Sequence, residues 1–156
     1  MPQGFHLKMK VVATEQRVWK ALSAAHARMA AGMEEDLRSA SGLSLKEHQL
    51  LAELADRPDA AIRLHELAEL LVLTPSGISR LVDRLEAEAL VARITCPADR
   101  RGFHARLTDS GRARLEAAQE RHAAALQRLI GDLPQDLLEK LADSLERVSA
   151  RDCVKG

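Results

Sequence analysis

Residues 74–106 read TPSGISRLVDRLEAEALVARITCPADRRGFHAR and carry the clearest structural signal in this 156-residue chain. Thr74 can cap a helix with its hydroxyl, and Pro75 suits the first helical position because no hydrogen-bond donor is needed there. Four apolar residues follow at i, i+3, i+4 and i+7, the spacing of one α-helical face: Ile78, Leu81, Val82 and Leu85. The pattern predicts a helix over residues 74–88.

A second short helix is predicted immediately upstream. The stretch LHELAELL, residues 64–71, places leucines on one helical face, and only Val72 and Leu73 separate it from Thr74. Two short helices joined this tightly indicate a helix-turn-helix, whose second helix enters the DNA major groove, about 12 Å wide. The polar side chains of the second helix are then candidate DNA contacts: Thr74, Ser76, Ser79, Arg80 and Arg84. The alternative for the same residues is an ordinary solvent-exposed helix face.

A β-hairpin is predicted directly after this helix. The runs LVARITC and FHARLT alternate roughly between apolar and polar residues and flank the turn PADRRG. The hairpin covers residues 91–107, with Asp99, Arg100 and Arg101 at its tip. A narrow minor groove attracts arginine strongly, so Arg100 and Arg101 are candidate DNA contacts. Asp99 would position a guanidinium, because phosphates repel a carboxylate.

Residues 64–115 resemble the winged helix-turn-helix core of the MarR family of bacterial transcriptional regulators. The segments that carry the resemblance are HELAELL, LTPSGISRLVDRLEAEALV, DRR and LTDSGRARLE. The resemblance implies a homodimer that binds a pseudo-palindromic operator in double-stranded DNA, with Asp99 and Arg101 in the wing. Val72 and Ala89 stand at two turns where the family usually has glycine. Because glycine takes positive φ without penalty, this departure predicts a shifted or strained backbone at both turns.

Long helices are predicted on both sides of this core, from apolar residues at three- and four-residue steps. One covers residues 14–40 and two more lie within residues 109–150. The core itself, residues 44–108, opens with a capping box made by Ser44 and Glu47. Long apolar stripes need a partner, so we expect the terminal helices to form a dimer interface. The alternative is that they complete a monomeric core.

The predicted fold is one MarR-like unit over residues 1–156, mainly α with a small β-hairpin (α+β). Hydrophobic residues make up 46% of the chain and aromatic residues only 2%, which predicts a core of packed Leu, Ala, Val and Ile. Many nucleic-acid-binding domains are basic, yet here 23 Lys and Arg balance 23 Asp and Glu. The charges are nevertheless segregated: residues 74–106 hold six Arg against four acids, and residues 132–152 hold six acids against three bases.

The chain lacks the sequence motifs that mark several other classes of protein. No HExxH, CxxC, GxSxG, P-loop or dinucleotide fingerprint occurs, so we expect neither an enzyme nor a bound metal or cofactor. No signal peptide or membrane-length apolar run is present and the two cysteines need not pair, which favours the cytoplasm. A redox role for Cys96 or Cys153 is disfavoured, because redox-sensing family members usually place the reactive cysteine in the first helix.

Many members of the resembled family bind a small, often aromatic or phenolic, molecule between the dimerisation helices and the winged domain. Trp19 is the candidate to stack on such a ligand, and His26, His48 and Arg63 are candidates near the same junction. A lone Trp is also a common packing or interface residue. Three hypotheses remain: a dimeric repressor released by a ligand, a DNA-binding regulator without a ligand, and a winged-helix scaffold that binds protein.

Overall fold

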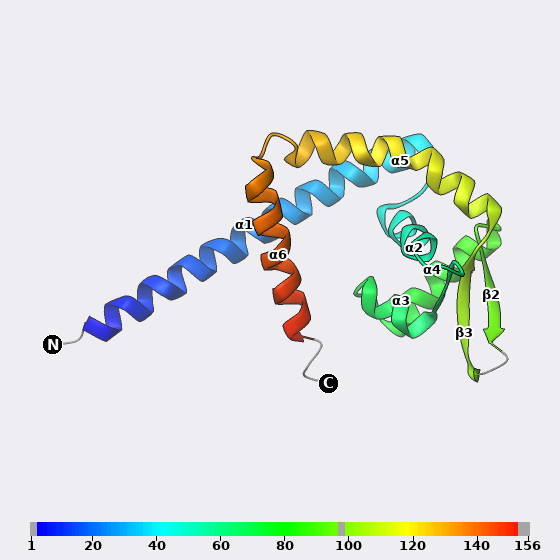
Figure 1. The fold of residues 1–156 in the computed structure, drawn as a ribbon, viewed down its shortest axis with the longest axis horizontal. Helices are drawn as coiled ribbons and strands as arrows, with labels where there is room; N and C mark the ends of the chain where they lie inside the picture. The colour runs from blue at the N-terminus through cyan, green and yellow to red at the C-terminus, as the bar shows by residue number, and fades with distance from the viewer. Residues whose placement is uncertain (1–2, 97–98, 153–156) are drawn as a thin grey trace. The chain divides into compact units, whose positions relative to one another are not determined.

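The structure is a computed structural model that describes residues 3–96 and 99–152 (Figure 1). Its elements, in chain order, are α1 (Gln3–Ser41), α2 (Leu45–Ala55), β1 (Ala61–Arg63), α3 (Leu64–Leu70), α4 (Pro75–Ala87), β2 (Val91–Cys96), β3 (Asp99–Leu107), α5 (Asp109–Ile130) and α6 (Gln135–Asp152). The elements form two compact units, Met1–His122 and Ala123–Gly156. The boundary between the two units falls within α5.

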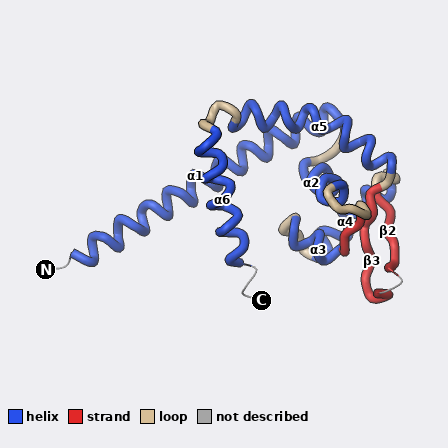
Figure 2. Tube along the Cα trace, in the orientation of Figure 1, coloured by secondary structure: helices blue, strands red, loops and turns tan. Residues whose placement is uncertain are grey.

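Helices dominate the chain and a small antiparallel sheet accompanies them, which confirms the predicted α+β class (Figure 2). β2 and β3 form the predicted hairpin. The sequence does not predict β1, which pairs with β3 so that the strand order is β1-β3-β2. Three residues are too few to show the alternation that marks a strand. The sheet therefore joins the hairpin to the segment of chain that leads into α3.

α3 and α4 form the helix-turn-helix. Thr74 caps α4, because its Oγ1 accepts a hydrogen bond from Gly77 N at 3.1 Å, and Pro75 occupies the first turn. The apolar residues of the predicted helix face are all buried: Ile78, Leu81, Val82 and Leu85. They join one core with residues from α1, α2, α3, the sheet and α5. The opposite face of α4 is consequently turned toward solvent.

Three non-glycine residues of the described chain have a positive φ: Ala60 (51°), Val72 (52°) and Ala89 (57°). The strain predicted at Val72 and Ala89 is therefore present, and Ala60 adds a third position. A left-handed conformation costs an L-residue roughly 1–2 kcal/mol. Packing does not offset this cost at Val72, whose side chain is 88% exposed. The recognition helix α4 thus lies between two turns that both carry backbone strain.

The contacts at the start of α5 explain the residue types in the segment LTDSG, residues 107–111. Thr108 Oγ1 accepts a hydrogen bond from Gly111 N at 3.0 Å and donates to Ala89 O at 2.7 Å. A β-carbon on Gly111 would overlap the carbonyl oxygen of Leu90. Only glycine therefore lets the first turn of α5 approach the turn after α4 this closely.

α1 begins at Gln3, so the start predicted at residue 14 is wrong. In the added segment Phe5, Met9 and Val12 stand at i, i+4 and i+7, the spacing of one helical face. The earlier start could therefore have been recognised from its apolar residues.

Two helices carry apolar stripes that remain exposed in the single chain. One stripe lies in the middle of α1: Val18, Trp19 and Leu22. The other follows α6 at steps of three and four residues: Leu137, Leu141, Leu145 and Val148. Contiguous exposed apolar side chains of this kind usually mark a binding surface.

Candidate nucleic-acid interface

The solvent-facing side of α4 carries the polar residues that the sequence singles out. Ser76, Arg80 and Arg84 are exposed, and Ser79 is half-buried. Arg80 Nε donates to Ser76 O at 3.2 Å, so this side chain lies along the helix surface. Thr74 is exposed at the N-terminus, where its hydroxyl already serves as the cap. The structure places all of these candidates away from the buried core.

A hollow of about 390 Å³ lies beside this face. It is lined by Lys46 from α2, by Arg80 and Arg84 from α4, and by the small or apolar residues Leu73, Gly77 and Leu81. The described residues that line the hollow thus include three cations and no carboxylate, an arrangement that attracts anions such as phosphate. Sequence analysis does not find Lys46, because nothing distinguishes it from other surface lysines until α2 and α4 are placed together.

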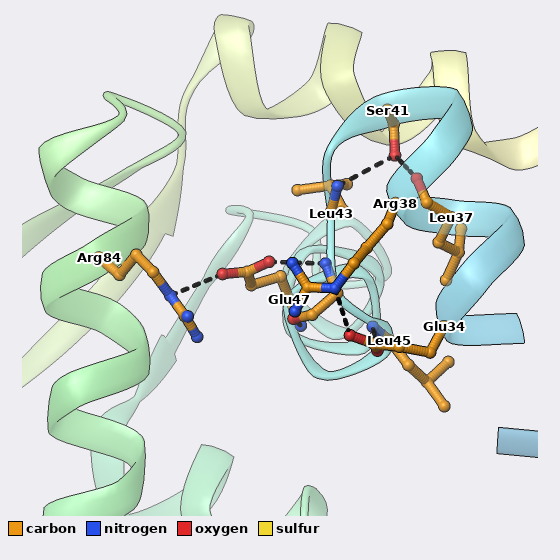
Figure 3. A network of polar contacts seen from close by, with 9 residues as sticks. Glu34, Leu37, Arg38, Ser41, Leu43, Leu45, Glu47 and Arg84 are labelled. Atoms are coloured by element: carbon orange, nitrogen blue, oxygen red, sulfur yellow. Dashed lines mark hydrogen bonds and ion pairs between the residues drawn. The ribbon is translucent and has the colours of Figure 1, made fainter. Parts of the chain in front are cut away.

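Arg84 is held by a buried carboxylate. Its Nε lies 2.7 Å from Oε1 of Glu47, whose side chain is only 6% exposed (Figure 3). The other carboxylate oxygen, Oε2, accepts a hydrogen bond from Ser44 N at 2.6 Å and completes the predicted capping box of α2. The Arg84 side chain remains 56% exposed. The guanidinium is therefore fixed at one end and accessible at the other.

The base of the hairpin is fastened to α4 by Arg93. This half-buried residue of β2 pairs with Asp83 and, at 3.1 Å, with Glu86 Oε2. It also donates to Ser79 O at 3.2 Å. The sequence gives no sign of these contacts, because they depend on the angle between strand and helix. They hold the hairpin and the helix in one arrangement.

The predicted wing contacts begin β3, where Asp99, Arg100 and Arg101 occupy successive positions. The side chains of these three residues, and the whole of residues 97–98, lie outside the described part of the chain. Cys96 ends β2 and its side chain is likewise not described, while Cys153 lies outside the described residues.

Comparison with known proteins identifies the family. Residues 41–102 match the model of the MarR family. The transcriptional regulator MhqR of Bacillus subtilis is 30% identical over 100 residues, which make up 64% of this chain and 66%, just under two thirds, of MhqR. Sco3205, a MarR family regulator from Streptomyces coelicolor solved in complex with DNA, is 31% identical, with a TM-score of 0.80 over 90% of this chain and 88% of that one. The chain belongs to the MarR family.

A further similar structure was solved with a small molecule. CouR from Rhodococcus jostii RHA1, bound to p-coumaroyl-CoA, is 26% identical with a TM-score of 0.78 over 85% of this chain and 91% of CouR. The relatives are transcriptional regulators, which confirms the prediction of a regulator and not an enzyme. Within residues 3–96 and 99–152, no group of three or more His, Cys, Asp or Glu side chains is placed to hold a metal ion. No helix of that part is long and apolar enough to span a membrane.

The candidate ligand residues are not gathered in one place. Trp19 and His26 are exposed on α1, and Arg63 is exposed on β1. His48 on α2 is buried, only 3% exposed. It lines a second pocket, of about 410 Å³, which also borders the turn of the helix-turn-helix at Val72. Trp19, His26 and Arg63 do not line that pocket.

His48 lies against a residue that the sequence analysis does not find. Its ring centroid is 4.3 Å from that of His122 on α5. Burial, and then the neighbouring His122, lower the pKa of His48 from its ordinary value of 6.5 to about 4, and burial also lowers the pKa of His122. Among the described residues, neither ring nitrogen of His48 has a hydrogen-bond partner, and nor does Oε1 of Gln49 beside it. The imidazole of His48 is therefore uncharged at neutral pH, whereas Lys46 and Glu53 bring charge to the wall of the same pocket.

Proposed function

We propose that this MarR family protein is a sequence-specific double-stranded-DNA-binding regulator that acts as a homodimeric repressor in the cytoplasm. The observation that carries the proposal is the hollow beside the recognition helix, whose described lining includes the cations Lys46, Arg80 and Arg84 and no acid. The likeness to Sco3205, which was solved in complex with DNA, supports the same use of this face.

Each part of the interface has a distinct role in the proposal. Arg80 and Arg84 reach the major groove, where a guanidinium can pair bidentately with guanine or grip a phosphate. Ser76 and Ser79 add hydroxyl contacts on the same helix. Lys46 meets a backbone phosphate, a contact that adds affinity without sequence preference. Arg100 and Arg101 of the wing enter the minor groove, with Asp99 orienting the guanidinium of Arg101.

The exposed apolar stripes support the proposed dimer. The stripe on α1, with Val18, Trp19 and Leu22, and the stripe on α6 each expose apolar side chains that a second copy of the chain would cover. A two-fold dimer presents two recognition helices to half-sites about one helical turn apart, roughly 34 Å. A pseudo-palindromic operator matches this symmetry.

We further propose that a small molecule relieves DNA binding from the pocket that His48 lines. CouR, which was solved with p-coumaroyl-CoA, supports a ligand-responsive regulator. Polar His48 and Gln49 line this pocket beside apolar Leu71 and Val72, and a mixed lining of this kind suits a small aromatic or phenolic molecule. Lys46 lines both this pocket and the hollow beside α4, so an occupant of the pocket lies next to a proposed phosphate contact.

The test is fluorescence anisotropy of the purified protein with a duplex from the DNA flanking its gene, beside a scrambled duplex, at several salt concentrations. We expect tight binding to the first duplex alone, weakening steeply with salt, and loss of that binding on Arg80→Ala. Equal, salt-insensitive binding to both duplexes, together with failed selection from a random pool, would favour the protein-binding scaffold instead. DNA binding that responds to no small molecule would favour a ligand-independent regulator.

A further inference from the structure

We infer that Glu47, a buried carboxylate outside the helix-turn-helix, is a positioning residue for DNA reading that acts through Arg84. The inference rests on the proposed DNA binding. Glu47 lies on α2, and only 4% of its surface is exposed. It is therefore poorly placed to meet DNA itself, yet it contacts one of the two α4 guanidiniums in the proposed reading face.

The carboxylate of Glu47 is rigidly held. Oε2 accepts from Ser44 N at 2.6 Å, while Glu47 N donates to Ser44 Oγ at 3.2 Å, so the residue is fixed at both its backbone and its side chain. Oε1 is left for Arg84 Nε, 2.7 Å away. Each oxygen thus serves one partner, and the position of Arg84 follows from the capping geometry of a different helix.

The first turn of α2 is in turn bound to α1. Leu45 N donates to Glu34 Oε2 at 2.6 Å, and Glu34 Oε1 lies 2.7 Å from Arg38 Nε (Figure 3). Two carboxylates therefore cap the same helix start, where the positive end of the helix dipole favours them. Glu47 forms an ion pair with the recognition helix, whereas Glu34 forms its ion pair within α1. Substitution of Glu47 therefore tests the contact with Arg84, and substitution of Glu34 is its control.

Holding Nε suits a guanidinium that has to read DNA. An arginine side chain has many rotamers, and an arginine that is already fixed loses less freedom when it binds. Because the 2.7 Å contact with Glu47 is made through Nε, the two terminal nitrogens of Arg84 can form a bidentate contact with guanine or phosphate. Loss of Glu47 would leave the charge of Arg84 but not its orientation.

The decisive variant is Glu47→Gln. Glutamine keeps the shape and supports a capping box, because its amide oxygen can accept from Ser44 N. Its NH2 group then faces Arg84 Nε, so a donor meets a donor and the contact is lost. Glu34→Gln is the matched control, since it alters the other cap of α2 without touching Arg84. Thermal melts of both variants establish that they fold.

The measurement is a double-mutant cycle of operator affinity with Glu47→Gln, Arg84→Ala and the two combined. The probe is the duplex identified by the anisotropy experiment or by selection from a random pool. We expect Glu47→Gln and Arg84→Ala each to lose about tenfold in affinity, as for one lost base contact. The double variant should bind no more weakly than Arg84→Ala alone, and Glu34→Gln should bind like the wild type.

Two outcomes would overturn the inference while leaving the proposed function intact. One is wild-type affinity in Glu47→Gln although Arg80→Ala abolishes binding. The other is an additive double variant, which would show that Glu47 acts through general stability and not through Arg84. A wild-type protein that binds no duplex would remove the proposed function and this inference together.

Discussion

The buried histidine of α2 makes the stability of this protein depend on pH. In the unfolded chain His48 titrates near 6.5, whereas burial and the neighbouring His122 lower its pKa in the folded protein to about 4. Above about pH 6.5 both states are neutral, and the full stability is present. As the pH falls toward 4, the unfolded chain binds a proton that the folded protein refuses, so the free energy of unfolding decreases. Below that point the folded protein is protonated too, and the loss levels off.

The size of this effect follows from the difference between the two pKa values. At 1.36 kcal/mol per unit, a shift from 6.5 to about 4 lowers the free energy of unfolding by about 3 kcal/mol. Urea denaturation at fixed protein concentration, repeated from about pH 7.5 to about pH 4, measures it. Carboxylates also titrate at the acidic end, so the quantity to compare is the difference between the wild type and His48→Leu.

His48→Leu should lose much less stability over this range, because leucine cannot be protonated and neither ring nitrogen of His48 has a hydrogen-bond partner in the described part of the chain. His26→Leu is the control: His26 is exposed, and its variant should follow the wild-type pH profile. Parallel loss of stability in the wild type and in His48→Leu would refute the reasoning, since the imidazole would then not be the group that resists protonation.

Three further predictions concern the turn, the hollow and the core. Val72→Gly should raise the free energy of unfolding by about 1 kcal/mol in a urea melt, because glycine removes the left-handed strain and the exposed valine packs on nothing. Val18→Gly is the control, and it should lower the free energy of unfolding because it places glycine in the middle of a helix. If both variants lowered the free energy of unfolding, the strain at Val72 would be contradicted. Lys46→Gln should reduce the slope of log affinity against log salt by about 1 on operator and scrambled duplexes alike, whereas an unchanged slope would remove Lys46 from the phosphate contacts. Leu81→Ala should lower the free energy of unfolding by about 2–5 kcal/mol, whereas Leu70→Ala, at an exposed position, should lower it far less. Equal decreases in the two variants would argue against the described core.

Features that depend on neighbours within one helical turn could be predicted from the sequence. The cap at Thr74 and the buried face from Ile78 to Leu85 belong to this class, because both are set by residues three or four positions apart. The strain at Val72 and Ala89 could also be predicted. The prediction requires only that a turn with positive φ is recognised and that a residue other than glycine stands in it.

Features that arise from contacts between distant segments could not be predicted. β1 has three residues and becomes a strand only by pairing with β3. The contact between Glu47 and Arg84 joins two helices, and in the sequence Glu47 reads only as the partner of Ser44 in a capping box. His122 likewise gains its place against His48 from the packing of α5 on α2. Local patterns specify the elements, whereas the site depends on how those elements meet.

The short strand β1 has a consequence for the DNA that this protein would read. Its residues Ala61–Arg63 pair with the inner hairpin strand, and Arg93 fastens the outer strand to α4. The base of the hairpin therefore cannot slide relative to the recognition helix. Within a half-site, the number of base pairs between the step read by α4 and the groove beside the hairpin is then fixed. Natural operators of different length would have to differ in the spacer between the two half-sites.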